Sequence, residues 1–189
     1  MNNLLLEIRQ CQACLSDLVN GVNPVLSAHT NSKIAIIGQA PGSVVHRTGI
    51  PWDDKSGERL RKWLDVDKDT FYNPEIFAII PMGFCYPGKG KSGDLPPRKE
   101  CAPLWHKKLF DQMPELELFL LIGTYSQAYY LDKRKKTLTE TVKNFQEYLP
   151  QFLPLPHPSP RNNIWLKKND WFERDLVPIL QRKVKAFVQ

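Results

Sequence analysis

The four cysteines have the clearest potential for shared chemistry. Cys11 and Cys14 form a C-x-x-C pattern, and Cys85 and Cys101 both lie in the proline-rich segment 81–103. Four thiolates can close around one zinc ion or around a [4Fe–4S] cluster. The amino-terminal residues MNNLLLEIRQ do not form a secretory signal, so we expect a cytoplasmic protein, in which metal ligands or free thiols are commoner than disulfides.

A second group of candidate residues lies in two turns rich in glycine or proline. The turn GQAPG contains Gly38, Gln39, Ala40, Pro41 and Gly42, and it follows the apolar run 34–37. It matches neither G-x-G-x-x-G nor G-x-x-x-x-G-K-[ST], so the common phosphate-binding motifs are absent. The turn PHPSP contains His157 and Ser159, and prolines flank the histidine on both sides.

The elements that must position these turns alternate along the chain. Apolar runs predict strands at 33–38, 76–81, 116–123 and 152–155. Helices are expected at 3–10, 56–64 (with Ser56 as a candidate N-cap), 100–113, 124–131, 137–148 and 170–187. This alternation predicts an α/β fold with a parallel sheet covered on both faces. The carboxyl ends of such strands share one edge, so we expect GQAPG, PMGFC, IGTYS and PHPSP to converge there on one crevice.

Composition limits the class of protein and its partners. The chain has 189 residues, a formal net charge of +6 and no visible repeat or linker, which predicts one domain over 1–189. It has no apolar stretch of about 18 residues, so no membrane helix is expected. A basic chain is compatible with an anionic partner such as nucleic acid. The run KRKK at 133–136 would either face that partner or form a solvated loop.

Taken together, these motifs resemble the uracil-DNA glycosylase superfamily, and most closely its iron–sulfur branch. GQAPG is similar to the first motif of that branch, HPSP at 157–160 is similar to the second, and the cysteines match in order and spacing. RTGIPWDDKSGERLRKWL, at 47–64, looks like the intervening segment. The resemblance covers residues 5–185. It implies a three-layer α/β/α sandwich with a central four-stranded parallel sheet, and a [4Fe–4S] cluster (zinc as the alternative) on Cys11, Cys14, Cys85 and Cys101.

The resemblance also implies a reaction, the hydrolysis of the N-glycosidic bond of a flipped-out deaminated base, with uracil the first expectation. Trp52 occupies the position of a stacking phenylalanine, although it is also suited to the core. His157 stands where the superfamily histidine donates to the base and stabilises its developing negative charge. DNA, single- or double-stranded, would be the partner of a monomeric enzyme that makes no contact with a membrane.

Several positions depart from the pattern of the iron–sulfur branch. Gln39 replaces its glutamate, Ala40 stands where another branch has a catalytic aspartate, and Pro81 replaces the asparagine that reads the base. Gln39 can still orient a water molecule. Asp53 and Asp54 are the nearest carboxylates; either would activate water or support a positively charged sugar, or would cap the following helix.

After the second motif, RNNIWLKKN replaces the usual wedge loop of the family. Arg161 or Asn162 would fill the space that the flipped base leaves in the stack, and Lys167 and Lys168 would contact phosphates. Two alternative functions remain at this stage. One is a catalytically weak homologue that binds damaged or abasic DNA, and the other is an unrelated metal- or nucleotide-binding α/β protein.

Overall fold

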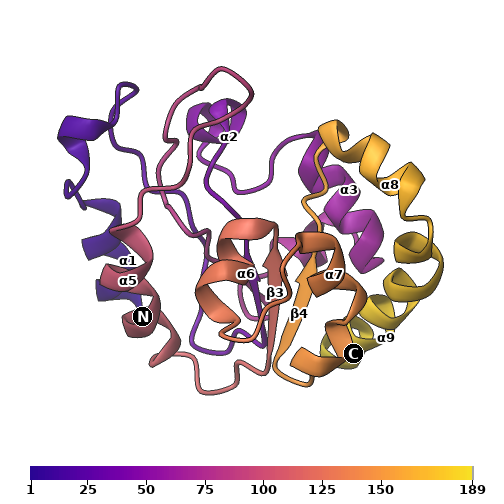
Figure 1. Cartoon of the computed structure of the whole chain (residues 1–189). Helices are drawn as coiled ribbons and strands as arrows, with labels where there is room; N and C mark the ends of the chain where they lie inside the picture. The colour runs from indigo at the N-terminus through magenta and orange to yellow at the C-terminus, as the bar shows by residue number, and fades with distance from the viewer. Residues whose placement is uncertain (189) are drawn as a thin grey trace.

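The computed structural model describes residues 1–188, which build an α/β fold around a four-stranded, all-parallel sheet (Figure 1). The strands lie in the order β2-β1-β3-β4. Their bounds are β1 Ile34–Ile37, β2 Phe77–Ile79, β3 Leu118–Ile122 and β4 Phe152–Leu155. The predicted fold class is therefore confirmed, and all four carboxyl ends lie along one edge of the sheet.

The register of the sheet aligns apolar residues of neighbouring strands. Ile36 pairs with Ile79 on one side and with Leu120 on the other, and Leu120 pairs with Leu153. Almost every strand residue is buried, as expected for a parallel sheet covered on both faces.

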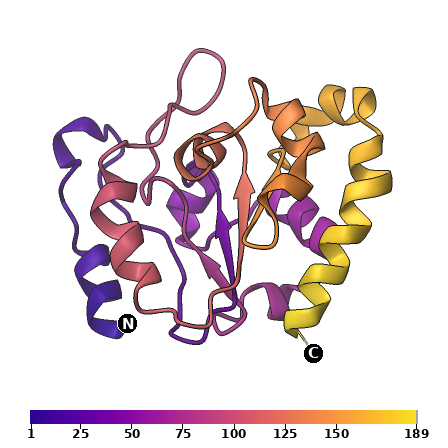
Figure 2. The same ribbon diagram turned by 60° about the horizontal axis from the view of Figure 1, so that its bottom comes forward.

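Helices cover both faces of the sheet. Helices α3 (Lys55–Leu64), α7 (Leu138–Lys143) and α9 (Val177–Val188) contribute to the core that includes Ile34 and Ile36. On the other face, α1 (Asn2–Arg9) and α5 (Cys101–Phe110) pack against Ala78 and Ile80. Helix α6 (Thr124–Tyr130) lies beside α5, and Figure 2 shows these layers on either side of the strands.

Shorter elements complete the description. They are the helices α2 Ser43–Thr48, α4 Lys68–Phe71 and α8 Asn163–Lys168, the 3₁₀ turns Leu15–Asp17, Phe145–Tyr148 and Pro160–Asn162, and the π-helical stretch Phe172–Leu176. Within residues 1–188, no helix is both long and apolar enough to cross a membrane.

Two local expectations were wrong, and one segment for which no element was predicted is helical. Asp54, not Ser56, caps α3, because its carboxylate accepts a bond from the Gly57 N–H at 2.9 Å. The helix expected at 137–148 breaks at Asn144, whose side chain bonds to the Glu140 carbonyl and whose φ and ψ are not helical. The segment RNNIWLKKN is helical, because Ser159 caps a 3₁₀ turn with Pro160 in its first position, and α8 follows directly.

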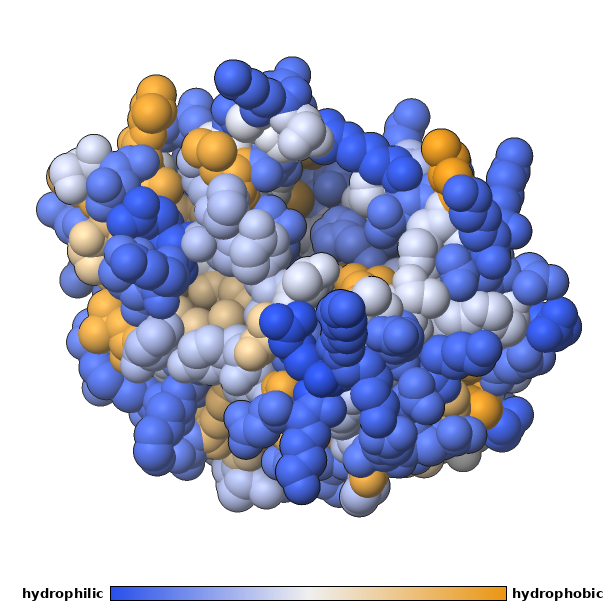
Figure 3. Space-filling view, in the orientation of Figure 1, coloured by the Kyte–Doolittle hydropathy of each residue, from blue (hydrophilic) through white to orange (hydrophobic). Residues whose placement is uncertain are grey.

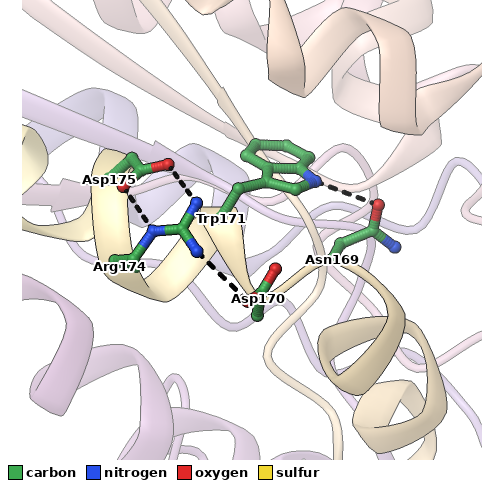
Figure 4. Close-up of polar contacts among 5 residues, drawn as sticks. All are labelled: Asn169, Asp170, Trp171, Arg174 and Asp175. Atoms are coloured by element: carbon green, nitrogen blue, oxygen red, sulfur yellow. Dashed lines mark hydrogen bonds and ion pairs between the residues drawn. The ribbon is translucent and has the colours of Figure 1, made fainter.

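Side-chain bonds hold the turn between α8 and the carboxyl-terminal helical segment (Figure 4). The Trp171 indole N–H donates to the Asn169 side chain at 3.2 Å, and the Arg174 guanidinium pairs with Asp170 and Asp175. These ion pairs are exposed to solvent, so each contributes little to the stability of the fold. The turn connects α8 to the carboxyl-terminal helical segment.

Candidate active site

A cavity of about 470 Å³ lies at the carboxyl edge of the sheet, where three of the four predicted turns meet. Figure 3 shows this face of the molecule, which is mostly hydrophilic and hollowed near its upper edge. The volume lies in the range of ordinary small-molecule sites. The predicted residues that line the cavity are Gly38, Gln39, Ala40, Pro41, Gly42, Trp52, Asp54, Pro81, His157, Ser159, Arg161 and Asn162.

Trp52 forms an aromatic wall of this cavity and has an unusual backbone. Its φ is 55°, a left-handed conformation that bulky residues rarely adopt. The strained turn fits because Gly57 lies directly beneath it: a β-carbon on Gly57 would lie 1.8 Å from the Trp52 carbonyl oxygen. Gly38 makes a similar close approach to the indole, at 2.9 Å from the position of a β-carbon. Strain of this kind is often found at functional sites.

His157 lies beside Trp52, with the two ring centroids 5.5 Å apart. The Ser159 backbone N–H donates to the His157 Nδ1 at 3.2 Å, and the Asn162 side chain donates to the His157 carbonyl at 2.7 Å. Burial lowers the pKa of His157, and the nearby carboxylates of Asp54 and Asp94 only partly oppose it. The imidazole is therefore neutral at neutral pH. Because Nδ1 accepts a bond, the proton lies on Nε2 as a donor.

The two candidate aspartates have different positions. Asp54 lines the cavity, but one of its carboxylate oxygens is already committed to the N-terminus of α3. Asp53 does not line the cavity. The capping role that the sequence allowed for this pair therefore applies to Asp54, which also faces the site.

Gln39 has a specific partner outside the first motif. Its side-chain amide donates to the Leu95 carbonyl at 3.0 Å, and so joins the GQAPG turn to the loop 88–97. That loop adds Ser92, Gly93 and Asp94 to the lining of the cavity. Sequence analysis missed Asp94; the only local signal was a Gly-Asp turn in a proline-rich segment.

Pro81, at the position that the resemblance aligns with a base-reading asparagine, lies in the wall of the cavity, and the buried His106 contacts its carbonyl. The His106 Nε2 lies 3.0 Å from the Pro81 carbonyl, and the Tyr130 hydroxyl bonds to His106 Nδ1. Burial lowers the pKa of His106 to about 4 and raises that of Tyr130, so Tyr130 donates and His106 Nε2–H donates in turn. The Pro81 carbonyl therefore has its partner within the protein.

A smaller cavity of about 220 Å³ adjoins the first one. The two cavities share Gln39, His157 and Asn162, and the IGTYS turn lines the smaller one through residues 122–125. The four predicted turns thus meet at one edge, as expected, but they divide between two connected hollows with His157 at the boundary.

The predicted DNA-contacting residues are split in the same region. Arg161 and Asn162 line the larger cavity, whereas Lys167 and Lys168 are exposed at the end of α8 and do not line it. Arg59 of α3 positions this segment by donating to the Ser159 carbonyl at 3.3 Å and to the Asn163 side chain at 2.8 Å.

The four cysteines all line one small apolar cavity on another side of the molecule. They come from three segments: the end of α1, the loop after β2, and the first turn of α5. Among residues 1–188, no three cysteine, histidine or acidic side chains converge closely enough to ligate a single ion. Burial raises the pKa of Cys14 and Cys85, and that of Cys101 to about 12.

Arg98 also lines this thiol cavity, and its Nε–H is buried without a partner among the described residues. Its Nη2 pairs with Asp17 and Glu100, both at 2.9 Å. An unpaired donor beside four thiols suits a group that carries sulfur acceptors. The soft donor set and this orphaned N–H therefore fit a thiolate-ligated metal centre.

An α/β sandwich with an aromatic wall and a neutral histidine at the carboxyl edge of its sheet has the shape and the donor that suit a planar polar ligand. The family comparison gives this class a name. Residues 25–181, most of the chain, match the model of the Uracil DNA glycosylase superfamily, and the chain belongs to that superfamily. This excludes an unrelated α/β protein. The matched range does not include Cys11 or Cys14, so it identifies the superfamily and not one of its branches.

Proposed function

We propose that this protein is a DNA glycosylase that hydrolyses the N-glycosidic bond of a flipped-out deaminated base, with uracil as the first candidate. The observation that carries the proposal is His157, a neutral histidine with a free Nε2–H beside an aromatic wall. A base must leave the duplex before an enzyme can act on it, at a cost of a few kcal/mol. Stacking on Trp52 would offset part of that cost.

The chemistry follows from how the bond breaks. The electron pair of the C1′–N bond leaves with the base while positive charge grows on the sugar. His157 Nε2–H would donate to the base oxygen that becomes negative, as an oxyanion-hole donor does. A carboxylate in the cavity would support the sugar cation and accept a proton from the attacking water.

We further propose that the chain belongs to the iron–sulfur branch, with a [4Fe–4S] cluster on Cys11, Cys14, Cys85 and Cys101. Zinc would require sulfur atoms at about 2.3 Å from one point. Four thiols from three segments around one cavity, beside the buried Arg98 Nε–H, support a thiolate-ligated centre, and the order and spacing of the cysteines along the chain favour the cluster over zinc. When bound, the cluster would supply structural cross-linking of three segments, and no step of the hydrolysis passes through it.

Positive charge would provide the affinity for DNA. Arg161 at the cavity mouth, with Lys167 and Lys168 on α8, would contact phosphates beside the extruded base.

One observation favours a second candidate, a protein that binds damaged DNA without cleaving it. The wall residue Pro81 has no side-chain donor for reading a base, and its carbonyl is bonded to His106.

A screen for base excision separates these two functions. Single-stranded and duplex oligonucleotides carrying uracil, hypoxanthine, xanthine or an alkylated base would be incubated with the protein under single-turnover conditions. Excision of at least one base, with a loss of about 10²–10³-fold in rate on His157→Ala, supports the glycosylase. Tight binding to lesions with no excision by the wild type would replace it with the damage-binding function.

A further inference from the structure

We infer that Asp94 is the carboxylate that accepts the proton of the attacking water, and that Gln39 is a positioning residue that holds the loop of Asp94 over the cavity. This inference rests on the proposed function and deepens it. Its starting observation is that the loop 88–97, which lies outside both superfamily motifs, reaches into the larger cavity.

The loop is folded back on itself, so that its tip is held. The Leu95 N–H donates to the Gly88 carbonyl at 2.9 Å, and the Gly90 N–H donates to the Gly93 carbonyl. Lys89 and Asp94 form an antiparallel bridge across the base of this turn. Figures 1 and 2 show the loop rising at the upper edge of the molecule, above the carboxyl ends of the strands. The chain therefore presents Asp94 at a fixed point.

The surroundings of Asp94 place its carboxylate inside the site. Its Oδ2 lies 3.6 Å from the position of a β-carbon on Gly42, the last residue of the first motif. Asp94 and Asp54 both lie close enough to His157 to raise its pKa in opposition to burial, and Asp94 adds to the effect of burial in raising the pKa of Tyr86. Asp94 therefore lies between the first motif and the histidine, where a water molecule would approach the sugar of a base held against Trp52.

Asp54, the other carboxylate in the cavity, is less suited to this step. Its Oδ1 accepts the Gly57 N–H at 2.9 Å and satisfies the amino terminus of α3. Protonating this side chain would weaken the cap, which is worth about 1 kcal/mol at a helix terminus. Asp94 caps no helix, and its side chain is exposed to the solvent that supplies the water.

Gln39 connects the first motif to this loop. Its amide N–H donates to the carbonyl of Leu95, the neighbour of Asp94. A glutamate at this position would lack that donor and would place a negative charge beside a carbonyl oxygen. Gln39 therefore holds the loop 88–97 against the first motif. Asp94 of this loop supplies the carboxylate that the first motif lacks.

The proposed step balances with water as the only co-reactant. The water oxygen forms a bond to C1′ while the C1′–N bond breaks. The electron pair of the C1′–N bond leaves with the base. One water proton passes to the Asp94 carboxylate, and the base anion is held by the His157 Nε2–H. Asp94 then returns its proton to the released base through solvent, which restores both groups.

The test compares matched variants on the oligonucleotide that the wild type cleaves fastest in the four-lesion screen. Asp94→Asn should lower the single-turnover rate by about 10²–10⁴-fold, the usual range for a general base, with DNA affinity and melting temperature unchanged. Asp69→Asn removes the same charge from the exposed surface of α4 and serves as the control. In Asp94→Ala, added formate should restore part of the rate, because a small carboxylate can enter the vacated space.

The role of Gln39 is tested by a double-mutant cycle. Gln39→Ala should slow the wild type but should have little further effect in the Asp94→Asn background, because it acts through that carboxylate. If the losses in rate from the two substitutions are additive, Gln39 does not act through Asp94. If Asp94→Asn keeps full activity while Asp54→Asn is inactive, the assignment of Asp94 is wrong and the glycosylase proposal stands. If the wild type cleaves no lesion, both fall together.

Discussion

The buried histidine behind the cavity wall allows a prediction with a calculable size. His106 donates to the Pro81 carbonyl and accepts from Tyr130, and its pKa in the folded protein is about 4, against about 6.5 for a free histidine. The unfolded chain therefore binds a proton at a higher pH than the folded protein does. Stability contributed by the neutral ring is complete above pH 6.5 and is lost as the pH falls toward 4.

At about 1.4 kcal/mol per pH unit, this single group should lower the free energy of unfolding by about 3 kcal/mol between pH 7 and pH 4. We expect His106→Gln to be less stable than the wild type at pH 7, because it loses the Tyr130 contact. Between pH 7 and pH 4, the free energy of unfolding of this variant should fall by about 3 kcal/mol less than that of the wild type. Urea unfolding at several pH values between 7 and 4 measures the difference directly.

His29→Gln provides the control for removal of a histidine. The His29 ring accepts only the Asn31 N–H in an exposed turn, so this variant should follow the wild-type curve. Identical pH dependence in the wild type and in His106→Gln would refute the assignment of a neutral, buried His106.

Three further predictions concern the metal, the DNA and the aromatic wall. Protein purified without oxygen should be brown and contain iron, and Cys85→Ser should bleach it; protein that holds neither iron nor zinc would contradict the metal site. Affinity for a labelled oligonucleotide should fall steeply with salt, and Lys167→Ala with Lys168→Ala should reduce the salt slope by about two, whereas Lys185→Ala on α9 should leave it unchanged. Trp52→Ala should weaken binding to DNA with an extruded base by about 1–3 kcal/mol while undamaged DNA binds as before, and equal losses on both would exclude a stacking role.

The fold was predictable because its signals are local. The run at 116–123 is apolar throughout, and the structure places Leu118–Ile122 at the centre of the core. The alternation of such runs with helical segments predicted the parallel sheet. The parallel sheet in turn predicted which turns share an edge. The errors arose where one side chain competes with the backbone, as Asn144 does at the end of α7.

The candidate site was only partly predictable, because some of its residues depend on contacts between distant segments. Trp52 and His157 lie in recognisable motifs, and the structure places their rings 5.5 Å apart. Asp94 belongs to no motif, and it reaches the cavity because the Gln39 amide fastens its loop. The support of Pro81 by His106 is equally hidden, since His106 is followed by two lysines and resembles the exposed face of a helix.

The loop that carries Asp94 also connects the two candidate sites. It leaves the thiol cavity after Cys85, crosses the larger cavity at residues 92–94, and returns to the thiol cavity at Cys101. A group bound by the thiols would fix both ends of this loop, and the bond from Gln39 to Leu95 would fix its middle. A loop held at three points has fewer conformations to lose when DNA binds, and so its carboxylate costs less to position. On the proposed function, this explains why a structural cluster would be useful in an enzyme whose hydrolysis requires no redox chemistry.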